Sequence, residues 1–280
     1  MKKLIALILT LILTLSIPAL AENVQAAGPV DDAAQDNLAG FIIVLHTGDT
    51  LGASGEGLSF EHVAEARARF TDEGAAVLLL DDGGILPGDA GEEQAASILQ
   101  AMTAAGYDAM CPAAPEFRQG LDQLAAMKSA AGFPLLSVNA LDAEGARLLS
   151  GSIIVEKDGL RIGVFGATGA SEAEGLTISD AAKAAQSAVS TLRGEGCDVV
   201  VALARLGADE TGAPAAVSLA QAVDGIDIVI DMSAKAPAEG LWTDSGALVV
   251  SSPAQFRGIG IVAIDPTGRC AAMVMDDSWF

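Results

Sequence analysis

Short apolar runs alternate with amphipathic segments along most of this 280-residue chain. The runs have the composition of buried strands, and the segments between them repeat apolar residues at the spacing of one helix face. Strands are predicted at 40–47, 75–82, 107–112, 133–140, 197–207 and 227–233. Helices are predicted at 60–70, 91–106, 117–132, 179–196 and 213–223. This alternation favours an α/β fold in which helices cover the sheets.

The other segments are richer in strands than in helices. Residues 151–168 predict a hairpin that turns at residues 157–159. Antiparallel strands are predicted to close the fold at 247–252, 258–268 and 271–277. The sheets are therefore expected to be mixed rather than purely parallel. Because no Pro/Ser-rich linker interrupts residues 39–280, a single domain is predicted over that range.

The N-terminus has the features of a bacterial-type secretory signal peptide. Two lysines precede an apolar run over residues 4–20, and a small-residue Ala-Leu-Ala site ends at Ala21. We expect cleavage after Ala21, which removes residues 1–21 and makes the protein secreted or otherwise extracytoplasmic. The alternative is an uncleaved anchor, because a run of this length is near the lower limit for a membrane span. Residues 22–38 are small and polar and are predicted to be a linker.

Charge and cysteine content narrow the range of functions. The chain has a formal charge of −22 at pH 7. A surface of that sign repels nucleic acid and anionic lipid headgroups, so neither is an expected partner. Cys111, Cys197 and Cys270 are widely spaced and form no C-x-x-C pair, which excludes a zinc ribbon or a dithiol redox motif. They are predicted to be buried thiols.

Candidate functional residues follow the predicted strands, where catalytic groups of such sheets usually lie. The loops there contain the acids Asp49, Asp81, Asp82, Asp89, Glu116, Asp209 and Asp231 and the cations Arg118, Arg205 and Lys235. His46 ends a predicted strand and His62 lies in a predicted helix, so we expect a hydrogen-bonded core residue and a surface residue. Neither a nucleotide P-loop nor a G-x-S-x-G elbow occurs. These residues alone predict an acidic α/β domain and no particular reaction.

Taken in order, these loops resemble the motifs of a known family. VLHTGDTLG (44–52) is similar to H-T-N-D-x-H-G, LLLDDGG (78–84) to L-D-A-G-D, and GYDAMCPAAPEFRQG (106–120) to G-Y-D-A…G-N-H-E-F-D-x-G. VVVALARLGAD (199–209) is similar to a strand ending in S-H-L-G, and GIDIVIDMSAKAP (225–237) to G-I-D-x-I-I-G-G-H-S-H-T-P. From about residue 39 to 265 the chain resembles the metallophosphoesterase domain of the secreted 5′-nucleotidase/2′,3′-cyclic phosphodiesterase family. The resemblance implies a four-layer α/β/β/α sandwich with mixed sheets.

The resemblance also implies a set of metal-binding positions. In that family, Asp, His and Asn side chains from these loops hold two divalent metal ions that activate a water. The first Asp ligand is retained as Asp49, whereas the other ligand positions fall on Leu51, Gly84, Ala114, Arg205, Ser233 and Lys235. The catalytic proton donor, a His, falls on Pro115, and its carboxylate partner falls on Arg118. Apolar side chains offer no metal ligand, and Arg and Lys bring positive charge where dications would bind.

These replacements favour an exported, catalytically degenerate domain that is not an enzyme and acts by binding or scaffolding. It would need no metal cofactor, and its partner would be an unidentified protein or small anion. Arg118, Arg205 and Lys235 are candidates for an anion site, or Arg205 and Lys235 neutralise Asp49 and its acidic neighbours. The alternative is a 5′-nucleotidase-like phosphoester hydrolase with a rearranged, weaker site for Mn²⁺, Mg²⁺, Zn²⁺ or Ca²⁺. No C-terminal nucleotide-binding domain is expected.

Overall fold

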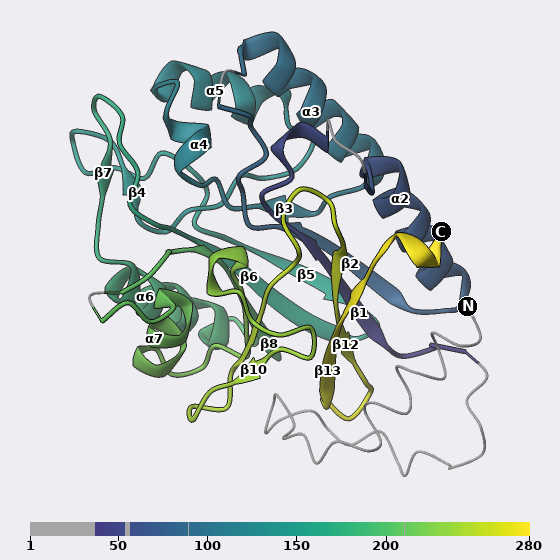
Figure 1. Cartoon of the computed structure of the whole chain (residues 1–280). Helices are drawn as coiled ribbons and strands as arrows, with labels where there is room; N and C mark the ends of the chain where they lie inside the picture. The colour runs from purple at the N-terminus through teal and green to yellow at the C-terminus, as the bar shows by residue number, and fades with distance from the viewer. Residues whose placement is uncertain (1–36, 54–56, 89, 210) are drawn as a thin grey trace.

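A computed structural model of the chain describes residues 37–53, 57–88, 90–209 and 211–280. Asp89 and the expected signal peptide lie outside these ranges. The expected linker also lies outside them, except for residues 37 and 38. Within them, two large sheets are flanked by helices (Figure 1). No helix in these ranges is both long enough and apolar enough to cross a membrane.

The first sheet combines parallel and antiparallel pairing in the order β13-β12-β1-β2-β3. Its strands are β1 (Ile42–Thr47), β2 (Ala76–Asp81), β3 (Ala109–Met110), β12 (Ile259–Ile264) and β13 (Cys270–Met275). β1, β2 and β3 are parallel, and β12 pairs antiparallel with both β1 and β13. The first sheet is therefore built from segments near both ends of the described chain.

The second sheet has the order β10-β11-β9-β8-β6-β5. Its strands are β5 (Ser152–Lys157), β6 (Leu160–Thr168), β8 (Val199–Arg205), β9 (Ile228–Ile230), β10 (Leu241–Trp242) and β11 (Leu248–Val250). The inner strands β6, β8, β9 and β11 are parallel, and β5 and β10 pair antiparallel at the edges. A separate small sheet joins β4 (Ala140–Leu141) to β7 (Thr177–Ile178).

The β5–β6 hairpin is the one predicted at 151–168. Its loop has φ 45° at Asp158 and 82° at Gly159, which suits a tight hairpin turn of the I′ type. Asp and Gly are among the residues that accept this backbone conformation at low cost, so the turn was readable from sequence.

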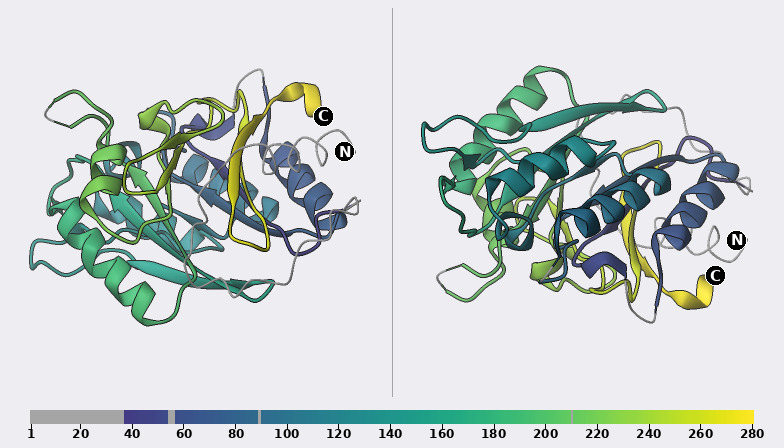
Figure 2. Two further views of the ribbon diagram at one scale, coloured as in Figure 1. Left: turned by 90° about the horizontal axis from the view of Figure 1, so that it is seen from below. Right: turned by 90° about the horizontal axis from the view of Figure 1, so that it is seen from above.

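Both large sheets bury both faces, which produces four layers. Ile42 and Val44 of β1 pack between the sheets, whereas Ile43 and Leu45 pack against helices, because successive strand residues point to opposite faces. The helices on that side are α2 (Phe60–Asp72), α3 (Glu92–Ala105), α4 (Ala114–Phe117) and α5 (Leu121–Ala130). On the outer face of the second sheet lie α6 (Ala181–Gly194) and α7 (Ala215–Ala222). Figure 1 shows these two helical layers on opposite sides of the sheets, and Figure 2 shows the arrangement from below and above, confirming the α/β/β/α sandwich.

The structure differs from the sequence prediction at several places, three of which change the bounds or the pairing of a predicted element. The helix predicted at 117–132 is interrupted at Gly120, which has a positive φ of 92°, so α5 begins at Leu121. The strand predicted at 133–140 is reduced to isolated bridges at Leu135 and Leu136, followed by β4. Residues 247–252 contain β11, which is parallel to β9 and does not join the antiparallel strands of the first sheet. Strand partners depend on tertiary contacts that the local apolar pattern does not encode.

Candidate functional site

The carboxyl ends of parallel strands from both sheets meet at one edge of the molecule. The charged residues at or just after these strand ends are Asp49 (β1), Asp81 and Asp82 (β2), Arg205 (β8) and Asp231 (β9). Their loops are in direct contact, because Asp49 N donates to Gly83 O and Met232 N donates to Asp82 Oδ2. The fold thus gathers five of the loop residues singled out in the sequence, and we refer to these five as the charged cluster.

Arg205 joins the two sheets through its guanidinium group. Nη2 donates to Asp49 Oδ1 at 2.9 Å, and Nη1 donates to Gly83 O at 3.4 Å. Nη1 also lies 3.7 Å from Asp82 Oδ1, within ion-pair range. The side chains of Arg205 and Asp49 are 15% and 26% exposed, and that of Asp82 is fully buried. Burial lowers the pKa of Arg205, but the Asp82 and Asp49 carboxylates more than offset this effect, so the guanidinium stays charged.

Two glycines leave the space that these ion pairs occupy. A Cβ atom at Gly84 would lie 2.9 Å from Asp49 Oδ1 and 3.1 Å from Arg205 Nη2. A Cβ atom at Gly48 would lie 1.6 Å from Asp82 Oδ1. Gly84 also has φ 75°, a conformation that L side chains rarely adopt. The observed position of Arg205 therefore depends on glycine at both sites.

Asp81 belongs to a buried hydrogen-bond chain. Thr47 Oγ1 donates to Asp81 Oδ2 at 2.6 Å, and Gly83 N donates to Asp81 Oδ1 at 2.7 Å. The same Thr47 hydroxyl lies 2.7 Å from Tyr107 OH. Burial raises the pKa of Asp81 to about 7, against the opposing effect of the Thr47 and Gly83 hydrogen bonds. Asp81 is therefore divided between its charged and neutral forms near neutral pH.

Asp82 and Asp231 are bound by backbone N–H groups of neighbouring loops. Beyond the Met232 bond to Oδ2, Asp82 Oδ1 has no hydrogen-bond partner among the described residues. Asp231 accepts from Leu206 N at 3.2 Å and from Ser233 N at 2.7 Å. Burial raises the pKa of both carboxyl groups, with Arg205 the main opposing influence at Asp82 and Ser233 at Asp231. The charged cluster thus contains more acid than the single guanidinium neutralises.

Glu116 holds the loops beside the charged cluster. Its carboxylate accepts hydrogen bonds from the backbone N–H groups of Gly84 (3.0 Å), Leu86 (3.1 Å) and Ala113 (2.8 Å). It is fully buried, and burial raises its pKa although these three bonds oppose the shift. Because every contact is to backbone, Glu116 acts as a structural clamp on the segment that contains Gly84.

The other positions that the resemblance names lie on the short helices and turns that follow β1, β3 and β9. Leu51 lies in the 3₁₀ turn η1 (Leu51–Ala53), and Ala114 and Pro115 begin α4. Ser233 lies in η2 (Met232–Ala234), where its hydroxyl donates to Asp231 and accepts from Gly207 N. Arg118 and Lys235 are exposed, and neither forms an ion pair with another described residue. Of the three candidate cations, Arg205 is the one in contact with the acids of the charged cluster.

Neither histidine contacts the charged cluster. His46 is buried in β1 opposite Gly260, as expected for a core residue, and burial lowers its pKa to about 3. The expected hydrogen bond is missing at its Nδ1, which has no partner within the described part of the chain. His62 is half-buried rather than a free surface residue, because its Nδ1 accepts from Ser59 N at 3.0 Å and caps α2.

Backbone strain is concentrated at the same edge. The described non-glycine residues with positive φ are Asp49, Leu51, Lys235, Gln255 and Phe256 here, and Asp158 in the distant hairpin. Gln255 and Phe256 belong to the β11–β12 loop, and Gln255 N donates to Asp49 O at 2.9 Å. This loop could not be recognised from the sequence, because neither Gln nor Phe is a residue that marks a left-handed conformation.

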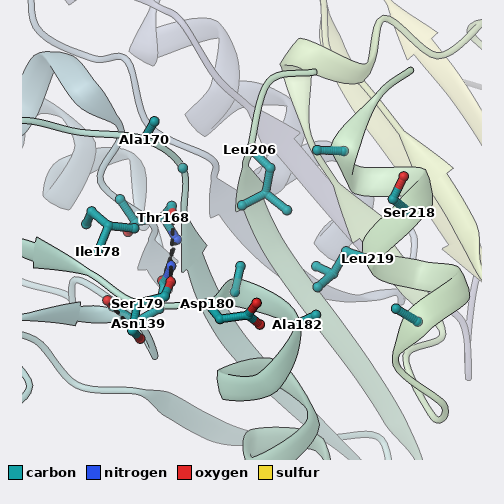
Figure 3. A pocket seen from close by; sticks show the side chains of 14 residues that line it. Asn139, Thr168, Ala170, Ile178, Ser179, Asp180, Ala182, Leu206, Ser218 and Leu219 are labelled. Atoms are coloured by element: carbon teal, nitrogen blue, oxygen red, sulfur yellow. Dashed lines mark hydrogen bonds between the residues drawn. The ribbon is translucent and has the colours of Figure 1, made fainter. Parts of the chain in front are cut away.

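A separate cavity of about 380 Å³ lies beside the Arg205 segment, between α6 and α7 (Figure 3). Its lining is mostly apolar and includes Leu206, the neighbour of Arg205. Asn139 braces one wall, since it donates to Thr168 O at 2.8 Å and accepts from Thr168 N at 2.9 Å. The lining residues include no member of the charged cluster. The cavity and the charged cluster are therefore distinct features that share the end of β8.

The described residues do not fit a two-metal centre. Asp49, which the resemblance predicts to be a retained ligand position, is paired with Arg205 at 2.9 Å. No group of three or more His, Cys, Asp or Glu side chains within the described ranges is placed to hold a metal ion. A guanidinium between Asp49 and Asp82 also brings like charge to the place where a dication would bind. The geometry therefore gives no basis for a reaction step through a metal at this edge.

Comparisons with known proteins identify relatives of the chain. No family model matches. The chain is 30% identical over 205 residues to a 5′-nucleotidase of Vibrio cholerae serotype O1, a match that covers 64% of this chain and 37% of that protein. It is 34% identical over 138 residues to a 5′-nucleotidase of Vibrio vulnificus, covering 45% and 25% respectively. The chain thus spans less than half the length of these curated relatives.

Solved structures with the same fold agree with this kinship. A 5′-nucleotidase precursor from Thermus thermophilus superposes with a TM-score of 0.71 at 22% identity, covering 85% of this chain and 55% of that one. A calcineurin-like phosphoesterase from Bacillus subtilis superposes with a TM-score of 0.69 at 18% identity, covering 84% and 90%. At these identities the superpositions establish the fold, and the kinship to 5′-nucleotidases comes from the Vibrio sequences.

Two expectations from the sequence are wrong in the light of these matches. The chain was expected not to be an enzyme, but its sequence relatives are named 5′-nucleotidases, which are enzymes. It was expected to need no metal cofactor, which conflicts with the fold it shares with a calcineurin-like phosphoesterase. Both expectations inferred a lost activity from lost side chains, and a list of replaced ligands is not a measurement of activity.

Proposed function

Because the chain belongs to the 5′-nucleotidase and metallophosphoesterase family, we propose that it is an exported hydrolase of small phosphoesters such as nucleoside monophosphates. The observation that carries the proposal is the match of 205 residues to a protein named 5′-nucleotidase. The N-terminal lysines, apolar run and Ala-Leu-Ala site support export. One of the structural relatives is likewise described as a precursor.

The charged cluster is the proposed place of reaction. Arg205 presents a planar group of N–H donors, which matches the oxygens of a phosphate and stabilises their charge. Asp49 Oδ1 already accepts one of these donors, so a bound phosphate would share the guanidinium with Asp49. Asp49 is also the more exposed carboxylate of the two paired with Arg205, which makes it the candidate to accept a proton from an attacking water.

The test is phosphate release by the purified chain from residue 22 onward. Substrates are p-nitrophenyl phosphate, 5′-AMP and 2′,3′-cyclic AMP, each assayed with added Mn²⁺, Mg²⁺ or Zn²⁺ and with a chelator. Arg205→Gln is expected to lower kcat/KM by at least about tenfold, because one lost charge-assisted contact is worth ~1.5–3 kcal/mol. The proposal is wrong if no substrate yields phosphate above the buffer rate under any of these conditions.

Arg269→Gln is the matched control. Arg269 forms an ion pair with Asp265 at 2.7 Å and has a similar partly buried setting. Arg269 and Asp265 lie in the turn between β12 and β13. This turn follows Ile264, which pairs with Ile42 at the start of β1, whereas Asp49 comes after the end of β1. The control should keep the wild-type rate. Equal losses in both variants would indicate general destabilisation rather than a role for Arg205 at the site.

A further inference from the structure

The loop between β11 and β12 crosses from the second sheet to the first at the edge that holds the charged cluster. Gln255 in this loop donates its backbone N–H to Asp49 O at 2.9 Å. Asp49 in turn accepts from Arg205 through its side chain. Gln255 is therefore the neighbour of a residue that directly holds the guanidinium.

Gln255 and Phe256 have φ angles of 56° and 52°, in the left-handed region. That conformation costs an L residue about 1–2 kcal/mol, and glycine would avoid the cost. Asp158 has φ 45° for a different reason, since it forms a hairpin turn whose geometry demands it and which Asp accepts readily. No hairpin turn of that kind accounts for the conformation of Gln255.

Phe256 explains how the strained conformation is held. Its ring is buried and packs edge-to-face on Phe60, with ring centroids 5.0 Å apart. Its carbonyl accepts from Leu58 N at 2.9 Å. Anchored in this way, Phe256 fixes the preceding residue, and the Gln255 side chain is left exposed with no hydrogen bond to the rest of the described chain. An exposed polar side chain is thus carried by a residue whose backbone contacts Asp49 and whose neighbour is buried.

Two buried hydroxyls on the adjoining chain segments have no hydrogen-bond partner among the described residues. Thr50 follows Asp49 and is 2% exposed, and Ser252 lies at the start of the β11–β12 loop and is 4% exposed. Neither Oγ atom forms a hydrogen bond within the described ranges. Buried hydroxyls are rarely left unpaired, so these two offer hydrogen-bonding capacity that no described residue uses.

We propose that Gln255 is a specificity-determining residue that reads the leaving group of the phosphoester. Its amide can both donate to and accept from hydroxyl and amide groups, which suits a sugar or nucleobase rather than the phosphate. Arg205 takes the phosphate, so the two residues divide the substrate between them. This inference rests on the proposed function for its substrate class.

The experiment compares binding of 5′-AMP and of inorganic phosphate by isothermal titration calorimetry. Wild type is expected to bind 5′-AMP at least about tenfold more tightly than phosphate, a difference of ~1.4 kcal/mol. Gln255→Gly removes the side chain and relieves the strain, so it should fold at least as stably and lose that preference while keeping its phosphate Kd. Gln255→Asn tolerates the same backbone and retains an amide, so it should keep most of the preference. Asp158→Gly relieves comparable backbone strain far from the site, so this variant should keep the full preference for 5′-AMP over phosphate.

The inference is overturned if Gln255→Gly retains the full preference for 5′-AMP. It is also overturned if wild type binds the two ligands equally or binds neither. The readout separates this inference from the proposed function. A preference that depends on Gln255 in a protein that releases no phosphate would leave the inference standing and refute the hydrolase. If the protein releases phosphate but Gln255→Gly keeps the full preference for 5′-AMP, the hydrolase proposal stands and the inference about Gln255 is refuted.

Discussion

Replacing Arg205 with Met should destabilise the folded protein strongly and in a pH-dependent way. The substitution keeps an apolar stem of similar length but leaves Asp49 and Asp82 without their cation. At separations of 2.9 and 3.7 Å, each carboxylate attracts the guanidinium by about 5 kcal/mol at an effective dielectric constant of about 20. Desolvation offsets much of this attraction, and breaking a buried pair typically costs ~3–5 kcal/mol. Asp82 carries most of the effect, because it is fully buried whereas Asp49 is a quarter exposed.

The loss should shrink in acid. Burial already raises the pKa of Asp82 well above its ordinary value, and removal of Arg205 raises it further. Once Asp82 is protonated it needs no counter-charge, so the variant regains stability relative to wild type. We expect a loss of about 3–5 kcal/mol at pH 8 and a loss smaller by at least ~1 kcal/mol at pH 5.5.

The assay is urea unfolding followed by circular dichroism at both pH values. Arg161→Met is the control, because its pair with Glu156 is 42% and 70% exposed and should contribute under about 1 kcal/mol at either pH. If Arg205→Met proves too unstable to purify, the double variant with Asp82→Asn should be recovered, since both buried charges are then absent. A loss below about 1 kcal/mol at pH 8, or an equal loss at both pH values, would refute the reasoning.

Three further predictions follow from contacts described above. Asp81 has a folded-state pKa of about 7, above its unfolded value, so it stabilises the fold at low pH and this contribution is lost as pH rises through 7. The free energy of unfolding of wild type should therefore fall by about 1 kcal/mol more than that of Asp81→Asn between pH 6 and 8, measured in urea. Gly84→Ala should cost at least ~1 kcal/mol more than Gly145→Ala, because both have positive φ but only Gly84 faces Asp49 and Arg205, whereas a Cβ at Gly145 meets open space. Thermal unfolding of the two variants provides the comparison, and equal losses would mean that the Arg205 pair tolerates a methyl group. Glu116→Ala should cost about 3 kcal/mol or more, since it leaves three backbone N–H groups unpaired, and hydrogen exchange at Gly84 and Leu86 should accelerate. Unchanged exchange there would contradict the role of Glu116 as a clamp.

Much of the fold was predictable because its elements are locally consistent. The alternating faces of β1 and the apolar spacing of α6 each follow from a short window of sequence. The Asp158-Gly159 turn could be predicted because Asp and Gly both favour the left-handed backbone conformation that the turn requires. The pairing of β11 with β9 could not be predicted, because strand neighbours depend on packing among segments far apart in the chain.

The candidate site was likewise predictable from sequence only in part. Strand ends point to one edge, so the gathering of Asp49, Asp82 and Arg205 could be anticipated from sequence. The contact between Arg205 and Asp49 could not, because it joins residues 156 positions apart and depends on the space left by Gly84. Gln255 was invisible for a different reason. Its conformation is imposed by burial of Phe256, which no local pattern reveals.

The pairing of β1 with β12 has a consequence for how the chain acquires its structure. β1 is among the earliest strands in the described chain, yet its antiparallel partner is β12, which includes Gly260 opposite His46. Until that late segment is available, β1 presents an open edge of unpaired backbone groups, and the first sheet lacks two of its strands. Contacts of such large sequence separation slow folding, because a long loop must close before they form. During synthesis, completion of the first sheet therefore waits until the strands of the second sheet, which lie between β3 and β12 in the chain, have all been made.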